Sequence, residues 1–156
     1  MNIAIIFAGG SGVRMGAGMP KQFLEINGKP IIIHTLDNFQ NSPSIDKIYI
    51  SCKKDYITTL QDLTKRFAIT KVCGIVEGGS NGQDSIYRAL RAADAENDKD
   101  AIVLIHDGVR PFVSEEVIQK NIECVKQHGS AVTCTSFFET PILSKGGEEV
   151  EEMPLK

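Results

Sequence analysis

Near its start the chain reads Ile3-Ala4-Ile5-Ile6-Phe7-Ala8-Gly9-Gly10-Ser11-Gly12-Val13-Arg14-Met15, an apolar run that passes directly into a glycine-rich segment. The apolar run predicts a buried strand of a parallel sheet. Glycine has no Cβ, so a glycine-rich loop after such a strand lets the backbone approach a phosphate closely. Arg14 and Lys21 follow the loop, and fixed cations there can neutralise charge that builds up during phosphate transfer. We therefore expect the functional site at the end of this strand.

The rest of the chain alternates apolar runs with helical patterns. Further strands are predicted over residues 45–52, 72–76, 101–105 and 131–137, and helices over 30–39, 56–67, 85–95 and 115–128. A short strand over 22–26 is expected to end in the turn Asn27-Gly28. Because strand–helix alternation implies right-handed crossovers, the pattern predicts an α/β fold with a Rossmann-like, doubly wound, mostly parallel sheet and helices on both faces.

Composition narrows the class of protein. The 156 residues fit one domain, and a formal net charge of −3 leaves no broad basic surface, so nucleic acid is not an expected partner. The four cysteines form no CxxC pair and have mostly apolar neighbours, which favours buried, reduced thiols over disulfides or zinc. Met1 is followed directly by a core strand and no apolar run approaches membrane-spanning length, so we expect a cytoplasmic protein without a signal peptide or membrane segment.

Three polar segments follow predicted strands. They are the glycine-rich loop, residues 77–85 and residues 106–111. Since ligands of a doubly wound sheet bind beyond the carboxyl ends of its strands, these segments should share one edge. A Walker loop is excluded because Gly12-Val13-Arg14 replaces its closing Gly-Lys-Ser/Thr. A GxGxxG dinucleotide fingerprint that starts at Gly10 fails at Met15.

The order of these motifs resembles a known family. The motifs are Ala8-Gly9-Gly10-Ser11-Gly12-Val13-Arg14-Met15, Pro20-Lys21-Gln22, Gly78-Gly79, Asp84-Ser85 and His106-Asp107-Gly108-Val109-Arg110-Pro111. Together they look like the cytidylyltransferases that act on 2-C-methyl-D-erythritol 4-phosphate or on D-ribitol 5-phosphate. The resemblance extends from Met1 to about Thr140. It implies a nucleotide-diphospho-sugar transferase type of fold and transfer of CMP from CTP to a polyol phosphate, with Mg²⁺ or another divalent cation and release of pyrophosphate.

The resemblance also implies residue roles. Arg14 and Lys21 match the catalytic cations that stabilise the transferring phosphate. The residues that match the nucleotide-binding part are Ala8, Gly9, Gly10, Ser11, Gly12, Gly79, Ser80 and Ser85. Asp107, Arg110 and Thr140 match positions near the acceptor or Mg²⁺, with Asp107 as a metal ligand. This chemistry needs no strong general base, because a phosphate monoester with a second pKa of about 6 is already a charged nucleophile.

Two departures from the family pattern stand out. Gly82 occupies the position of a family arginine, so either another basic residue (Arg88 or Lys53) or loop amides would have to take over its contact. Family chains also continue beyond the equivalent of Lys156, so we expect an α/β nucleotide-binding domain over residues 1–138 and the start of a truncated dimerisation and acceptor arm over 139–156. Gly146-Gly147 suits a hairpin tip in that arm. The full-length form is expected to be a homodimer.

Other interpretations remain open at this point. Ser85 and Asp107 also suit helix-cap or turn residues, and His106 suits a buried hydrogen-bonding residue rather than a ligand contact. Within the family, the sequence looks closer to the ribitol 5-phosphate branch in Ala8-Gly9-Gly10-Ser11-Gly12, Met19-Pro20-Lys21-Gln22-Phe23-Leu24 and Val109-Arg110-Pro111-Phe112. Alternatives for the whole protein are a catalytically silent CTP-binding homologue, a nucleotidylyltransferase that uses another nucleoside triphosphate, and a dinucleotide-dependent oxidoreductase.

Overall fold

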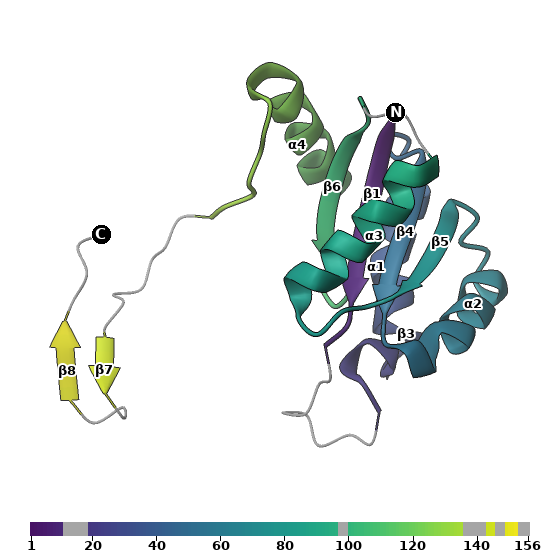
Figure 1. The fold of residues 1–156 in the computed structure, drawn as a ribbon, viewed down its shortest axis with the longest axis horizontal. Coiled ribbons are helices and arrows are strands. Elements are labelled where there is room, and N and C mark those ends of the chain that lie inside the picture. Colours follow the sequence, from purple (N-terminus) through teal and green to yellow (C-terminus); the bar gives the residue numbers. More distant parts are fainter. Residues whose placement is uncertain (11–18, 97–99, 136–142, 146–148, 153–156) are drawn as a thin grey trace.

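A four-stranded parallel sheet forms the centre of the computed structural model, which describes residues 1–10, 19–96, 100–135, 143–145 and 149–152. Its strands lie in the order β5-β4-β1-β6. Their bounds are β1 Asn2–Ala8, β4 Lys47–Cys52, β5 Val72–Glu77 and β6 Ile102–Asp107. Every neighbouring pair in this sheet is parallel. The predicted mostly parallel sheet is therefore confirmed (Figure 1).

Helices cover both faces of this sheet. They are α1 Ile31–Asn41, α2 Ile57–Arg66, α3 Gly82–Glu96 and α4 Glu115–His128. The core on one face joins sheet residues such as Ile6 and Ile48 with residues of α1, α2 and α4. The core on the other face joins Ile3 and Ile5 with Ala89 of α3. Figure 1 shows α3 in front of the sheet, so the doubly wound arrangement is confirmed.

The position of α3 creates a switch point in the sheet. The connections from β1 through β4 to β5 run over the α1 and α2 face, whereas α3 carries the chain across the opposite face to β6. β6 therefore lies next to β1, on the side away from β4. In open α/β sheets the crevice at such a switch point, beyond the carboxyl ends of the strands, is where ligands bind.

Smaller elements follow the glycine-rich loop. A 3₁₀ turn over Lys21–Phe23 (η2) precedes the hairpin of β2 Glu25–Ile26 and β3 Lys29–Pro30. Asn27 and Gly28 have φ values of 53° and 74°, the left-handed conformation that two-residue hairpin turns require. The predicted turn is confirmed. The predicted strand over 22–26 is wrong in its first half, where the 3₁₀ turn stands.

Three regions differ from the sequence-based expectations or extend them. Residues 131–135 form no strand, so the strand predicted over 131–137 is wrong for the part that the structure describes. β7 Leu143–Lys145 and β8 Glu149–Glu152 pair antiparallel on either side of Gly146-Gly147. A second 3₁₀ turn, η3 Lys54–Tyr56, leads into α2.

Cysteine burial and surface charge complete the description. All four cysteines are free thiols, but only Cys52 is buried, and Cys73 and Cys134 are exposed, so the expected burial is wrong for these two.

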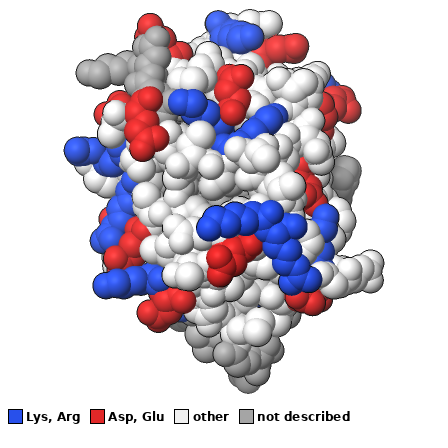
Figure 2. Space-filling view, turned by 90° about the vertical axis from the view of Figure 1, so that its right-hand side faces the viewer, with Lys and Arg blue, Asp and Glu red and all other residues white. Residues whose placement is uncertain are grey.

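On the face drawn in Figure 2, basic and acidic side chains are interspersed and form no broad patch of one sign. Within the described part of the chain, no helix has the length and apolarity that crossing a membrane would require.

Candidate active site

The glycine-rich loop leaves β1 and is tied down by a buried glutamine. Gln22 is 2% exposed, and its Nε2 donates hydrogen bonds to the Ala8 carbonyl (2.5 Å) and the Gly10 carbonyl (3.3 Å). Ala8 is itself buried as the last residue of β1. The start of the loop is therefore held to the chain twelve to fourteen residues later. Ser11, Gly12 and Arg14 lie outside the described residues.

Lys21 stands on a short turn with its own anchor. It begins η2, where the Phe23 amide donates to the Pro20 carbonyl at 3.0 Å. Phe23 is buried and stacks on Tyr56, with ring centroids 4.7 Å apart. Lys21 is half-buried on this anchored turn. The backbone beneath this cation is thus fixed by packing on one side and by Gln22 on the other.

The second loop, residues 78–85, is organised around Ser85. Its hydroxyl is buried, accepts a hydrogen bond from the Gly79 amide (3.0 Å) and donates one to the Asn81 carbonyl (2.8 Å). The Gly78 amide donates to the Cys52 carbonyl at 2.7 Å, which attaches the loop to the end of β4. Burial raises the pKa of the Cys52 thiol to about 11, so this thiol is neutral at ordinary pH.

The start of α3 is capped within the same loop. The Asn81 side chain accepts a hydrogen bond from the Asp84 amide at 2.9 Å, and the Asp84 carboxylate accepts one from the Ser80 amide at 3.1 Å. The first contact satisfies an amide that the first turn of a helix leaves without a partner, and the second holds a residue before the helix in place. Asp84 also pairs with Arg88 at 3.4 Å, so the arginine that could replace the family residue at Gly82 already has a partner.

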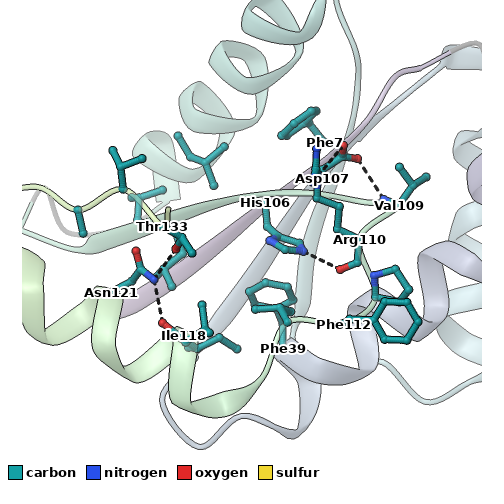
Figure 3. A pocket seen from close by; sticks show the side chains of 18 of the residues that line it. Phe7, Phe39, His106, Asp107, Val109, Arg110, Phe112, Ile118, Asn121 and Thr133 are labelled. Carbon is teal, nitrogen blue, oxygen red and sulfur yellow. Dashed lines mark hydrogen bonds and ion pairs between the residues drawn. The ribbon is translucent and has the colours of Figure 1, made fainter. Parts of the chain in front are cut away.

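The third loop follows β6 and carries Asp107 and Arg110. The Asp107 carboxylate accepts a hydrogen bond from the Val109 amide (3.1 Å) and lies 3.5 Å from Arg110 Nε. His106 Nε2 lies 2.9 Å from the Arg110 carbonyl, a contact drawn in Figure 3. The Arg110 side chain is 76% exposed and the Asp107 side chain 29%. Both charged groups can therefore reach a ligand in the crevice.

Two side chains of helix α1 form hydrogen bonds with carbonyls of this third loop. Thr35 Oγ1 donates to the Gly108 carbonyl at 3.0 Å, and Asn38 Nδ2 donates to the Pro111 carbonyl at 2.7 Å. A Cβ at Gly108 would lie 2.7 Å from Ile32 and 3.1 Å from Ala8, so only glycine lets the loop pack this closely against the end of β1.

The three loops meet at one edge of the sheet, as expected for this fold. A Cβ at Gly9 would lie 3.1 Å from Ser85 Oγ, and one at Gly78 would lie equally close to the same oxygen. Gly108 reaches Ala8 from the other side. The structure thus brings together most of the described candidates, namely Ala8, Gly9, Gly10, Gly79, Ser80, Ser85, Asp107 and Arg110, with Lys21 beside them. Thr140, like Arg14, lies outside the described residues.

A broad groove adjoins the third loop. It has a volume of about 980 Å³ and runs between β6, the loop after it and α4 (Figure 3). Phe39, Val113 and Ile118 line it together with the polar residues Asp107, Arg110 and Asn121. Ile105 and Phe112 beside it are 51% and 97% exposed. The groove therefore follows the outer edge of β6 and reaches the third loop at Asp107 and Arg110.

Asp107 is the described residue that fits a magnesium site. Among the residues that the structure describes, no three histidines, cysteines or carboxylates gather as a metal cage. Mg²⁺ commonly binds through one or two carboxylates together with substrate phosphates. One partly exposed carboxylate beside a candidate phosphate loop fits that mode.

Sequence reasoning missed the residues that hold the loops. Gln22, Thr35 and Asn38 are polar side chains that bond to loop carbonyls from elsewhere in the chain. Only the positions of these residues could have indicated their role, since Gln22 directly follows Lys21 and Thr35 lies on the buried side of a helix. Direct contacts of Ser85 or Asp107 with a ligand remain predictions.

Comparison with known proteins adds a family. A family model described as "IspD: 2-C-methyl-D-erythritol 4-phosphate cytidylyltransferase" matches residues 2–141. A ribitol-5-phosphate cytidylyltransferase of Streptococcus agalactiae is 50% identical over 154 residues, which are 98% of this chain and 64% of that protein. A 2-C-methyl-D-erythritol 4-phosphate cytidylyltransferase of Clostridium botulinum is 42% identical over 130 residues, or 83% of this chain and 56% of that protein.

A solved structure agrees with the fold. The 4-diphosphocytidyl-2C-methyl-D-erythritol synthase of Anaerococcus prevotii superposes with a TM-score of 0.77 and 28% identity, over 99% of this chain and 63% of that one. This chain therefore spans less than two thirds of the length of these relatives.

Proposed function

The chain belongs to the 2-C-methyl-D-erythritol 4-phosphate cytidylyltransferase (IspD) family, and on this basis we propose that it binds CTP and transfers CMP to a polyol phosphate with release of pyrophosphate. One observation carries the proposal. Three loops that match the family motifs approach one another at the carboxyl ends of β1, β5 and β6, where Ser85 and Gly108 bring their backbones close. That edge is where doubly wound sheets bind nucleotides.

The two sides of the crevice take different parts of the reaction. The glycine-rich loop with Arg14 and Lys21 cradles the triphosphate, and loop 78–85 holds the cytidine. Asp107 and Arg110 face the acceptor and the metal, and Thr140 contributes to the acceptor phosphate. When bound, Mg²⁺ would offset negative charge on the phosphates. Positioning two anions in line, with cations at the transferred phosphate, supplies the catalysis, since the acceptor phosphate is already ionised.

D-ribitol 5-phosphate is the acceptor that we favour over 2-C-methyl-D-erythritol 4-phosphate. The relatives named ribitol-5-phosphate cytidylyltransferase are 42–50% identical to this chain, whereas the relatives named for the erythritol substrate are 40–43% identical. We further propose a cytoplasmic homodimer in which residues 139–156, with the β7–β8 hairpin, begin the dimerisation arm after a nucleotide-binding domain over 1–138.

The second candidate function is CTP binding without turnover. Gly82 in place of the family arginine favours it, because one charge contact with the nucleotide is missing. The two functions separate in one assay: calorimetry reports CTP binding, and pyrophosphate release with each polyol phosphate reports turnover. Binding without release with either acceptor supports the silent homologue.

Substitution of the two cations tests the transfer reaction. Arg14→Ala and Lys21→Ala should each lower kcat for pyrophosphate release by about 10²–10³, a typical loss when a group that stabilises transition-state charge is removed. Lys65→Ala, on an exposed part of α2, is the matched control and should keep normal turnover. Circular dichroism checks that each variant folds. Near-normal turnover of both Arg14→Ala and Lys21→Ala would contradict the assignment.

A further inference from the structure

Gln22 is a buried amide that joins two parts of the candidate triphosphate site. Its Nε2 donates to the carbonyls of Ala8 and Gly10 in the glycine-rich loop. Gln22 itself belongs to η2, the turn that begins at Lys21. The same turn is anchored by the stack of Phe23 on Tyr56. One side chain therefore connects the loop to the turn that carries a candidate catalytic cation.

The geometry of the peptide bond gives this contact a direction. The Ala8 carbonyl and the Gly9 amide share one planar trans peptide, in which C=O and N–H point in opposite directions. When Gln22 holds the Ala8 carbonyl, the Gly9 amide faces away from Gln22. Amides that bind a phosphate must face it. The hydrogen bond therefore selects one orientation of the loop, with the Gly9 amide on the side opposite Gln22.

A carboxamide is well suited to this position. Its NH₂ group has two donors, and the two loop carbonyls are acceptors. A glutamate has the same size, but its ionised carboxylate accepts hydrogen bonds and cannot donate them. A methionine has similar length and leaves the buried Ala8 carbonyl without its partner. These two substitutions separate the loss of the hydrogen bonds from the loss of side-chain volume.

We propose that Gln22 is a positioning residue, which orients the Ala8–Gly9 peptide at the start of the glycine-rich loop relative to Lys21, so that the Gly9 amide and the Lys21 ammonium bind the same triphosphate. The proposal rests on the proposed function, which supplies CTP as the ligand. It deepens that function by assigning triphosphate recognition to a residue that need not touch the nucleotide. CMP keeps only the phosphate that is transferred, to which Lys21 is assigned, and lacks the β- and γ-phosphates. A loop in the wrong orientation should therefore weaken the binding of CTP more than that of CMP.

The first experiment compares CTP with CMP by calorimetry. Gln22→Met should raise the Kd for CTP about tenfold and change the Kd for CMP by less than about threefold. A tenfold change in Kd corresponds to about 1.4 kcal/mol of binding free energy, which is the size expected for the loss of such hydrogen bonds. Gln40→Met is the matched control, since Gln40 bonds to Lys71 and Thr70 far from the crevice, and both nucleotides should bind to it as to wild type. Equal losses for CTP and CMP would overturn the proposal.

A double-mutant cycle with Lys21 tests the coupling directly. If Gln22 acts on the triphosphate together with Lys21, Gln22→Met should weaken CTP binding much less in a Lys21→Ala background than in wild type. A purely structural role predicts equal effects in both backgrounds. Additive losses would therefore also overturn the proposal.

Carbonyl ¹³C chemical shifts test the same contact without any nucleotide. The shifts of Ala8 and Gly10 should change in Gln22→Met relative to wild type and Gln40→Met, because their carbonyls lose a hydrogen-bond donor, and unchanged shifts would overturn the orientation argument. If Gln22→Met fails to fold, Gln22→Glu replaces it at about pH 5, where burial favours a protonated carboxyl that can donate. The stability deficit of Gln22→Glu should shrink between about pH 8 and about pH 5, because a protonated carboxyl can again donate. Wild-type protein that does not bind CTP contradicts the proposed function alone, since the chemical-shift result is obtained without nucleotide.

Discussion

The two sides of the crevice are built differently. On the β1 and α3 side, the polar groups that hold the loops are buried: Gln22 and Ser85 are each 2% exposed. On the β6 side, the Arg110 side chain is 76% exposed and Phe112 beside it is 97% exposed. A groove of about 980 Å³ opens next to this second side. In keeping with the proposed function, we call them the nucleotide side and the acceptor side.

The difference in burial predicts which substitutions affect both the stability of the fold and the binding of ligand. Buried hydrogen bonds are costly to break, because the partner left behind loses both water and its protein contact. Substitutions on the nucleotide side should therefore affect the fold and ligand binding together. Exposed ion pairs contribute little to stability, so substitutions on the acceptor side should affect ligand binding alone. Three measurements can break or sharpen this contrast.

The largest expected effect is the pH dependence of unfolding that Cys52 causes. Its thiol has a pKa of about 11 in the folded protein and an ordinary value of 9.0. The folded state thus disfavours the thiolate, so its contribution to stability is complete below pH 9.0 and is lost as pH rises toward about 11. The free energy of unfolding should fall by about 2–3 kcal/mol over this range, measured by urea denaturation at each pH.

Cys52→Ala provides the comparison for that titration. It removes the buried ionisable group below the Gly78 loop, so its stability should vary less between pH 9.0 and pH 11 than that of wild type. Cys73→Ala, at an exposed position, should retain the full wild-type decline. Parallel curves for wild type and Cys52→Ala would show that the nucleotide side does not depend on a neutral thiol.

Ser85→Ala should have the next largest effect. The substitution leaves the Gly79 amide without its acceptor, at a cost of about 1–3 kcal/mol in the free energy of unfolding. CTP affinity should fall as well, because the hydroxyl also shapes loop 78–85. Urea denaturation and calorimetry measure the two effects. Ser130→Ala, at an exposed position, is the control, and a Ser85→Ala variant as stable as this control would remove the contrast between the two sides.

Asp107→Asn should have the smallest effect on stability. The exposed pair with Arg110 is worth at most about 1 kcal/mol, and an asparagine oxygen can still accept the hydrogen bond from the Val109 amide. We expect a change of about 0.5 kcal/mol or less in the free energy of unfolding, together with a higher Mg²⁺ requirement for pyrophosphate release. A large loss of stability with an unchanged Mg²⁺ dependence would reverse the roles given to this residue.

Regular elements were predictable wherever local sequence determines them. The helix predicted over 115–128 has those bounds in the structure, since Ser114 caps its first turn and Gly129 ends it in the left-handed conformation. The parallel sheet followed from the alternation of apolar runs with helices. The meeting of three loops followed from the rule that ligand loops gather at the carboxyl ends of the strands.

Long-range partners were not predictable in the same way. Residues 131–135 include β-branched side chains that favour extended backbone, but a strand also needs a neighbour for its hydrogen bonds, and periodicity does not reveal one. The sequence placed Gln22 in a short strand. Its hydrogen-bond partners, Ala8 and Gly10, lie earlier in the chain at separations that match neither a helix nor a strand period, so no local pattern indicated them. Thr35 likewise meets Gly108 only through the fold.

The two hydrogen bonds from α1 to the loop after β6 also bear on folding kinetics. Thr35 bonds to Gly108 and Asn38 bonds to Pro111, each across 73 residues of chain. Neither bond can close until the chain has passed through α3 and β6 has paired with β1. Closure over such separations is slow relative to helix formation. We therefore expect the crevice to form late in folding, at a rate that depends on chain topology more than on the helices that surround it.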